Sequence, residues 1–350
     1  MSFTDSIRRV TPYVPGEQPK DPDMIKLNTN ENPYPPSPAV EKAFSEFSAA
    51  SLRLYPDPAV SDLVAAIAEI YGVSEEEVFV GVGSDDVLAM CFLTFFNSGK
   101  PVLFPDITYS FYDVWAELFR IPYRRIPLLE DFTLEAEDYL VENGGIIFPN
   151  PNAPTGLLLP LAKVEQIVRE NPDSVVIVDE AYIDFGGESA LPLTRRYNNL
   201  IVVQTFSKSR NLAGMRIGFA IADRELIAAL SDVKYSFNSY TMNAPSIAAG
   251  TACMRDTEYF RRCTKRIMKT RAWAAEELRK LGFIVPDSAS NFLFVTHKSV
   301  PAEELFNYLK MQHIYVRYFK KPRIDNYLRI TIGTDAQMET LIRVLRSYLY

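Results

Sequence analysis

Residues 200–219 read LIVVQTFSKSRNLAGMRIGF, an apolar run that leads into a lysine flanked by hydroxyl and arginine side chains. The apolar residues 200–203 predict a buried strand, and Lys208 follows shortly after its end. A second apolar run, VVIV at 175–178, leads directly into Asp179. Continuous apolar runs separated by helical stretches are typical of parallel strands, because such strands are covered on both faces. One predicted strand therefore ends in a carboxylate, and the next continues into an amine.

This combination of an amine and a carboxylate suits pyridoxal 5'-phosphate. The cofactor needs a lysine for a Schiff base, a carboxylate beside its pyridine nitrogen and a cradle of donors for its phosphate. Lys208, Asp179 and Arg216 are of the right types for these three tasks. A lysine that follows a strand is by itself usually a solvated surface group, so the prediction depends on the joint pattern.

Further motifs extend the pattern over nearly the whole chain. They are NPNAPTG at 150–156, YLRITIG at 327–333, LNTNENP at 27–33 and RLYP at 53–56. Together with the lysine segment, they resemble the fold-type-I pyridoxal-phosphate aminotransferases of classes I and II, and among these the histidinol-phosphate aminotransferases. The resemblance implies an α/β fold, with a mostly parallel central sheet flanked by helices and a smaller α+β domain. It also implies transamination between histidinol phosphate and 2-oxoglutarate in L-histidine biosynthesis.

The resemblance implies a role for each matching residue. Lys208 is the expected cofactor-bound amine, Asp179 the partner of the pyridine nitrogen and Tyr182 the partner of the phenolic oxygen. Besides these three, the expected cofactor-binding residues are Ser84, Asp85, Tyr109, Asn152, Ser207, Arg216 and Tyr55, the last lent by a neighbouring subunit. The expected substrate-binding residues are Arg329, Arg317, Asn32 and Tyr13.

Two positions leave alternatives open. The family loop carries an asparagine immediately before Pro-Thr-Gly, and this chain has Ala153 there. Either the loop shifts to bring in Asn152, or Tyr182 acts alone at the phenolic oxygen; asparagines in such loops also serve turns. For the substrate phosphate, Arg317 is expected and Arg323 is the alternative, while a solvated basic face competes with both.

Composition narrows the class of protein. The chain has 350 residues, 47% of them hydrophobic, and a net charge of −7, which is ordinary for a soluble globular enzyme. We expect no nucleic-acid partner because no basic stripe is present, and no membrane span because no apolar stretch reaches about 20 residues. The first residues lack the apolar core of a signal peptide, and three cysteines fit a reducing cytoplasm. Neither the cysteines nor the two histidines have metal-ligand spacing, so no metal site is predicted.

Proline and apolar patterns predict three regions. Ten of the 24 prolines lie in the first 60 residues, where they favour extended backbone because proline fixes φ and removes a donor. We expect an N-terminal arm at 1–32 that lies on the small domain and on a partner subunit. A large cofactor-binding domain at 33–240 and a small C-terminal domain at 241–350 follow. Tyr55 would make the active site depend on a homodimer.

Other functions compete with this interpretation. A related enzyme with the same cofactor, such as an aromatic or other amino-acid aminotransferase or a threonine-phosphate decarboxylase, would share the same motifs. A non-catalytic binding module on the same fold is a remote alternative, and the intact Asp179, Lys208 and Arg216 argue against it. A dinucleotide loop at 81–83 is disfavoured because Asp86 stands where the third glycine is needed.

Overall fold

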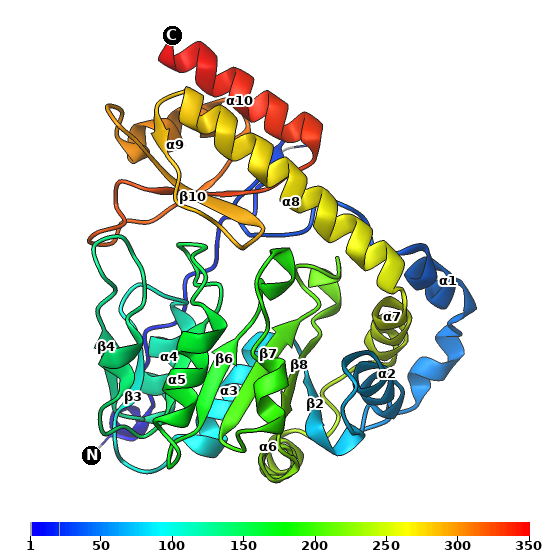
Figure 1. Cartoon of the computed structure of the whole chain (residues 1–350). Coiled ribbons are helices and arrows are strands. Elements are labelled where there is room, and N and C mark those ends of the chain that lie inside the picture. Colours follow the sequence, from blue (N-terminus) through cyan, green and yellow to red (C-terminus); the bar gives the residue numbers. More distant parts are fainter. Residues whose placement is uncertain (1, 21) are drawn as a thin grey trace.

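The computed structural model describes residues 2–20 and 22–350. It has two lobes, seen in the lower and upper parts of Figure 1. The lower lobe is built on a seven-stranded sheet, and the upper lobe on a four-stranded sheet. The predicted α/β fold with a smaller α+β part is confirmed.

The large sheet is mostly parallel. Its strands, in order across the sheet, are β2 (Val78–Gly81), β8 (Gly218–Ala222), β7 (Leu200–Thr205), β6 (Val176–Asp179), β5 (Ile146–Pro149), β3 (Val102–Pro105) and β4 (Tyr123–Ile126). Strand β8 runs antiparallel to both of its neighbours, and no α-helix separates it from β7. The parallel register places Asp179 opposite Val203, so β6 and β7 deliver their following residues to the same edge of the sheet.

Helices cover both faces of this sheet, which explains its continuous apolar runs. Ile177 and Ile201 pack into one core with α3, α4 and α6, whereas Val176, Val178 and Leu200 pack into another with α5. The helices of this lobe are α2 (Ser61–Tyr71), α3 (Ser84–Phe95), α4 (Phe111–Phe119), α5 (Leu161–Arg169), α6 (Arg224–Phe237) and, beside it, α1 (Pro38–Glu46) and α7 (Ala244–Arg255). The alternation follows from the two-residue repeat of a strand.

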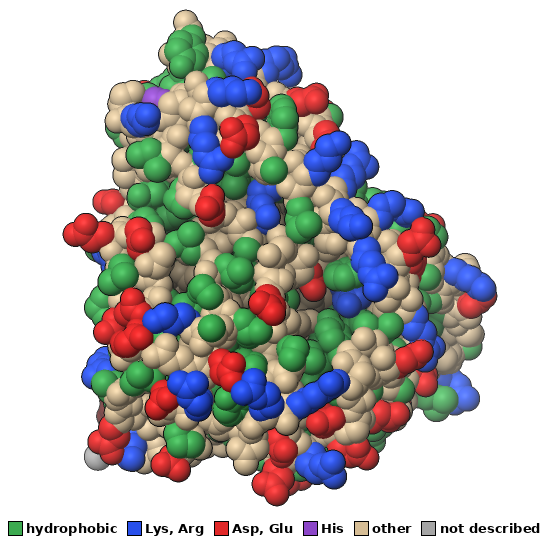
Figure 2. All heavy atoms as spheres, viewed as in Figure 1, with side chains coloured by type: hydrophobic (Ala, Val, Ile, Leu, Met, Phe, Trp, Pro, Cys, Tyr) green, Lys and Arg blue, Asp and Glu red, His purple; other side chains and the backbone are tan. Residues whose placement is uncertain are grey.

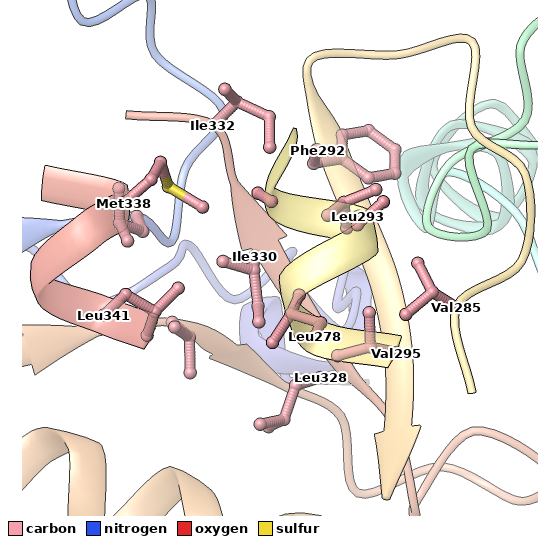
Figure 3. Close-up of a cluster of buried hydrophobic side chains, with 14 of the residues drawn as sticks. Leu278, Val285, Phe292, Leu293, Val295, Leu328, Ile330, Ile332, Met338 and Leu341 are labelled. Atoms are coloured by element: carbon pink, nitrogen blue, oxygen red, sulfur yellow. The ribbon is translucent and has the colours of Figure 1, made fainter. Parts of the chain in front are cut away.

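The upper lobe packs an antiparallel sheet against helices. Its strands, in order, are β12 (Arg317–Tyr318), β13 (Leu328–Thr331), β10 (Phe292–His297) and β9 (Phe283–Ile284), and its helices are α8 (Thr257–Lys280), α9 (Ala302–Met311) and α10 (Asp335–Leu349). Figure 3 shows Leu278 of α8 and Leu341 of α10 beside Ile330 of β13. This core holds β13 in place and thereby sets the position of Arg329. The Arg329 side chain lies on the opposite face of the strand from the core residues.

Helix α8 joins the two lobes. It runs diagonally from the end of α7 to the upper lobe in Figure 1, and Lys and Arg side chains gather along it in Figure 2. Its exposed basic residues include Arg261, Arg262, Lys265, Arg266 and Lys269. Among the described residues, no helix is long and apolar enough to cross a membrane.

The N-terminal segment contacts both lobes. Strand β1 (Ile25–Lys26) pairs in parallel with β11 (Ile314–Tyr315) of the upper lobe. Tyr13 stacks on Phe111 of the lower lobe with ring centroids 4.2 Å apart. Short 3₁₀ segments lie at Phe3–Ser6, Ala49–Arg53, Glu75–Glu77, Ala136–Tyr139, Ile183–Phe185, Leu191–Arg195 and Ala213–Met215.

The predicted domain limits at 32/33 and 240/241 stay predictions. Helix α7 lies beyond residue 240, yet Cys253 and Met254 share a core with side chains of α2, β2 and β8. We propose that the upper lobe begins with α8, because α7 packs with the lower lobe.

Candidate active site

The site lies where β6 and β7 end, at the edge of the large sheet. A cavity of about 350 Å³ opens there. The predicted residues that line it are Ser84, Asp85, Tyr109, Asp179, Tyr182, Ser207, Lys208 and Arg216. Parallel strands place ligand sites at their carboxyl ends, because the chain leaves the sheet there and loops from several strands meet. Residues more than 120 positions apart in the sequence thus surround one cavity.

Lys208 projects into this cavity from the turn after β7. Its Nζ lies 3.3 Å from the carbonyl oxygen of Thr29 and 5.9 Å from the centroid of the Tyr182 ring. The backbone around it is held from two sides. The amide of Asn32 donates to the Lys208 carbonyl at 2.9 Å, and the Ser207 N–H donates to the hydroxyl of Thr205 at 3.1 Å. The backbone of Lys208 is therefore held in place, and its flexible side chain can bring the amine to a ligand.

Asp179 forms the buried end of the cavity. Its Oδ2 accepts a hydrogen bond from the Tyr112 hydroxyl at 2.9 Å, and its Oδ1 accepts one from the Ala181 N–H at 3.2 Å. Burial raises the pKa of Asp179 to about 6, and the hydrogen bond from Tyr112 opposes that rise. A buried carboxylate of this kind gains from a cationic partner, so a protonated pyridine nitrogen fits this position.

The opposite end of the cavity is built to receive an anion. Helix α3 begins at Ser84, directly after Gly83, which has a φ of +89°. Backbone N–H groups at a helix start carry partial positive charge and attract phosphate. Arg216 adds a guanidinium that lies 3.1 Å from a carboxylate oxygen of Asp85. A Cβ on Gly218 would come within 2.2 Å of the Ser84 nitrogen, so only glycine lets β8 approach the helix start this closely.

Two tyrosines flank the space between these ends. The Tyr109 hydroxyl donates to Oδ1 of Asp85 at 2.7 Å, and burial together with that carboxylate raises the pKa of Tyr109 well above its usual range. The Tyr182 hydroxyl accepts a hydrogen bond from the Asn30 side chain at 2.9 Å. Both rings are thus oriented by a polar partner at the hydroxyl. This orientation suits Tyr109 to stack on a flat ligand and Tyr182 to contact the edge of that ligand.

Asn152 lies outside this arrangement. Its amide donates to the Ile107 carbonyl and to the Thr155 hydroxyl, each at 3.0 Å, and its oxygen accepts from Thr108 at 3.2 Å. Ala153, the residue that replaces the family asparagine, lines the cavity instead. The predicted contact of Asn152 with the cofactor stays a prediction, and the Tyr182 hydroxyl has a polar partner in Asn30.

A second cavity of about 450 Å³ adjoins the first, sharing Tyr109 and Ala153 with it. Arg329 and Arg317, which are register partners on β13 and β12, lie in its wall together with Tyr13. Arg329 donates to the Asn28 carbonyl at 3.1 Å, and burial lowers its pKa. Among the described residues its buried Nε has no hydrogen-bond partner. A guanidinium nitrogen that lacks a hydrogen-bond partner at a cavity wall favours the binding of an anionic ligand there.

Arg323, the alternative to Arg317, is engaged elsewhere. Its guanidinium donates to Oδ2 of Asp106 at 3.1 Å and to the carbonyls of Leu128 and Leu129 at 2.9 and 2.6 Å. Arg317 lies with its guanidinium over the Phe319 ring, 5.4 Å from the centroid. This arrangement favours Arg317 as the second anion-binding arginine.

Asn32 and Tyr55, two further predicted site residues, contact other parts of the chain. Asn32 uses its amide on the Lys208 backbone and its oxygen on the Tyr34 N–H, so it supports the lysine turn. Tyr55 lies on the surface, 82% exposed, with its ring 4.7 Å from that of Tyr240. Any contribution of Tyr55 to an active site therefore requires a second subunit.

Three neighbours of the cofactor site were not expected from the sequence. Tyr112 contacts Asp179, Asn30 contacts Tyr182, and the Thr29 carbonyl faces the Lys208 amine. Tyr112 lies in the first turn of α4, three residues after the predicted site residue Tyr109. Asn30 and Thr29 lie inside the LNTNENP motif at 27–33, which marked the segment but not these individual residues, and Asn30 has a φ of +58°.

Comparison with known proteins agrees with this geometry. The family model described as aminotransferase class I and II matches residues 22–345. The histidinol-phosphate aminotransferase of Brachyspira hyodysenteriae is 52% identical over 345 residues, covering 98% of both chains. Histidinol-phosphate aminotransferase 1 of Hydrogenovibrio crunogenus is 56% identical over 347 residues, covering 99% of this chain and 98% of that one.

Solved structures share the fold. The histidinol-phosphate aminotransferase of Clostridium acetobutylicum superimposes with a TM-score of 0.86 at 23% identity, over 93% of this chain and 99% of that one. That of Sinorhizobium meliloti, determined in complex with pyridoxal 5'-phosphate, gives 0.84 at 24% identity, over 92% and 91%.

The residues present fit the cofactor. A buried carboxylate, a lysine amine and a helix-start anion cradle surround one cavity, and a Cβ on Gly218 would obstruct that cradle. The sequence matches extend over nearly the full length, well beyond what isolated motifs provide. The chain therefore belongs to the pyridoxal-phosphate-dependent class I and II aminotransferases, and within them to the histidinol-phosphate aminotransferase family.

Proposed function

We propose that this protein interconverts histidinol phosphate and its keto counterpart, with glutamate and 2-oxoglutarate as the second pair. The observation that carries the proposal is the pairing of Arg329 with Arg317 in the wall of the second cavity. Guanidinium groups bind carboxylate and phosphate in the same forked geometry, so one site can serve both anions in turn. Relatives at 52% and 56% identity that bear this enzyme name support the choice of substrate.

The bound cofactor would supply an electron-accepting ring that stabilises negative charge on the reacting carbon. Lys208 would take the proton from the substrate carbon that bears the amine and pass it to the former aldehyde carbon of the cofactor within the same half-reaction, and the second half-reaction would run this transfer in the opposite direction. Asp179 would hold a proton on the ring nitrogen by charge. Tyr109 would lie against the ring, and Tyr182 would donate a hydrogen bond at the phenolic oxygen.

Substrates are held by the upper lobe. Arg329 contributes the buried Nε that lacks a partner among the described residues, and the desolvated position strengthens its bond to an anion. Arg317 stands next to it on the neighbouring strand and adds the charge that a phosphate requires. Tyr13, stacked on Phe111, closes the second cavity from the arm and offers a ring to the rest of the substrate.

Arg329→Ala is expected to impair both half-reactions, and Arg317→Ala to impair histidinol phosphate more than glutamate. Losing one charged hydrogen bond costs about 1.5–3 kcal/mol, or roughly 10- to 150-fold in kcat/KM. Each half-reaction is followed by the change in visible absorbance of the bound cofactor. Arg346→Ala, which removes an exposed arginine of α10, serves as the matched control.

Equal effects of Arg317→Ala on the two substrates would show that Arg317 does not discriminate phosphate. An unmodified protein that ignores histidinol phosphate but converts an aromatic amino acid would instead support the rival aminotransferase. Release of carbon dioxide from threonine phosphate would support the decarboxylase.

We also propose a homodimer with Tyr55 reaching the cofactor phosphate of the other subunit. The Tyr55 ring lies 4.7 Å from that of Tyr240, and both are exposed, as are Leu52, Leu54 and Phe237, which lie within three residues of one or the other in the sequence. Exposed apolar side chains favour a partner, because burying them in an interface lowers the free energy.

In keeping with the sequence prediction, we propose that the enzyme is cytoplasmic.

Mixing two inactive variants, Tyr55→Ala and Lys208→Ala, is expected to restore part of the activity. A mixed dimer would contain one site with both defects and one site with neither. Activity is measured after the two proteins are unfolded and refolded together, against each variant refolded alone. The shared site would be excluded if no activity returned although mass analysis showed mixed dimers. Full activity of a demonstrated monomer would exclude it as well.

A further inference from the structure

Arg323 connects the upper lobe to the lower lobe through three hydrogen bonds. The acceptors are Oδ2 of Asp106, which follows β3, and the carbonyls of Leu128 and Leu129, which follow β4. They lie between 194 and 217 positions away in the sequence. The guanidinium also lies over the Phe132 ring, 5.6 Å from its centroid. We call Arg323 and these four partners the inter-lobe clasp.

The lower half of the clasp is itself linked. The second oxygen of Asp106 accepts a hydrogen bond from the Leu128 N–H at 2.9 Å, so one carboxylate joins the segments after β3 and β4. The β3 segment continues into Tyr109 of the cofactor cavity. Beside the clasp, a small apolar cluster contains Leu128 and Phe132 of the lower lobe and Phe294 and Ile324 of the upper lobe. The hydrogen bonds of the clasp therefore border an apolar junction between the lobes.

The upper half of the clasp leads to the substrate arginines. Arg323 and Ile324 belong to the connection between β12 and β13, which also carries Phe319. The Phe319 ring lies 5.4 Å from the guanidinium carbon of Arg317 and 5.6 Å from that of Arg329. Arg317, Phe319, Arg323 and Arg329 all line the second cavity. Anchoring this connection at Arg323 thus fixes the ring between the two arginines.

Geometry separates Arg323 from an ordinary surface arginine. An exposed ion pair contributes little, because solvent screens it and two long side chains lose freedom. Arg323 instead satisfies two backbone carbonyls and one carboxylate with a planar fork, a task that a point charge cannot perform. It does so from a backbone φ of +70°, a conformation that a non-glycine residue keeps only when its surroundings hold it there.

We propose that Arg323 is a positioning residue that aligns Arg317 and Arg329 with the cofactor site, and so sets the affinity for anionic substrates. It acts through the inter-lobe clasp and does not touch the substrate. The inference rests on the proposed function only in that both arginines bind substrate anions. Loss of the clasp would let the β12–β13 connection move away from the lower lobe, and small misplacements of binding groups weaken substrate affinity strongly.

The test compares Arg323→Ala, Arg323→Lys and the control Arg346→Ala in the glutamate half-reaction. Arg323→Ala is expected to raise the KM for glutamate about tenfold, the factor that corresponds to one charged hydrogen bond. The kcat, the cofactor content and the thermal unfolding temperature should stay close to those of the unchanged protein. Arg323→Lys should lie between, because an ammonium group cannot reach all three acceptors at once.

An unchanged KM in Arg323→Ala, or an equal rise in Arg346→Ala, would overturn the proposal. If Arg323→Ala fails to fold, Arg323→Lys takes its place, and an unchanged KM in that variant also overturns the proposal. The glutamate half-reaction does not depend on the second substrate. A protein that ignores histidinol phosphate therefore contradicts the proposed function and leaves this test intact.

Discussion

Lys208→Ala is expected to abolish transamination and to leave a folded protein. In the proposed mechanism Lys208 is both the covalent partner of the cofactor and the group that moves the proton, so one truncation removes both tasks. Loss of the general base alone costs about 10²–10⁴-fold in rate. Folding should survive because the side chain projects into a cavity, and the turn that carries it is held through backbone contacts with Asn32 and Thr205.

The rate is measured with glutamate as donor, alongside the circular dichroism spectrum and the cofactor content after gel filtration. Lys100→Ala, which removes an exposed lysine paired with Glu142 at 2.9 Å, is the matched control. Adding a small primary amine should restore part of the rate in Lys208→Ala, because the amine can enter the vacated space and carry the proton. Turnover at the level of the unchanged protein would remove Lys208 from this role.

Asp179→Asn is expected to lower kcat by about 10²–10³-fold, the loss produced when one preorganised electrostatic contact is removed. An amide is neutral, so it cannot hold the ring nitrogen in its protonated form. Asparagine keeps the shape of aspartate and can still accept the hydrogen bond from Tyr112. The fold should therefore change little, and the defect should appear in kcat.

Glu180→Gln provides the matched control for Asp179→Asn. Glu180 is the neighbouring buried carboxyl, and burial raises its pKa to about 7. Its oxygens accept hydrogen bonds from Ser189, the Ala190 N–H and Gln204, so it points away from the cofactor cavity. The substitution should alter thermal stability and leave kcat nearly unchanged. A rate for Asp179→Asn close to that of the unchanged protein would reduce Asp179 to a structural residue of the strand end.

Local patterns predicted most of the large sheet. The apolar runs at 175–178 and 200–203 form β6 and β7. These strands are predictable because burial on both faces of a strand requires consecutive apolar residues, and that pattern is visible in neighbouring positions.

Long-range contacts could not be predicted in the same way. The Asn30–Tyr182 hydrogen bond joins residues 152 positions apart, and no periodicity in the arm marks Asn30. Asn152 was expected near the cofactor from the family motif, and its amide donates to the Ile107 carbonyl, 45 positions away, and to the Thr155 hydroxyl of its own loop. Motif spacing gives the order of residues along the chain and does not give the direction of a side chain.

The sequence by itself determined the chemistry of this protein. Lys208, Asp179 and Arg216 are identified by residue type and by their positions relative to predicted strands, and those features are local. The tertiary structure alone decided that the donors of Arg323 are engaged between the lobes. Arg317 and Arg323 are equally basic and six positions apart, and only the packing of the β3 and β4 segments against the upper lobe engages the donors of Arg323. Hydrogen-bond partners about 200 positions away arise from the closure of the whole chain, so no window of sequence contains them.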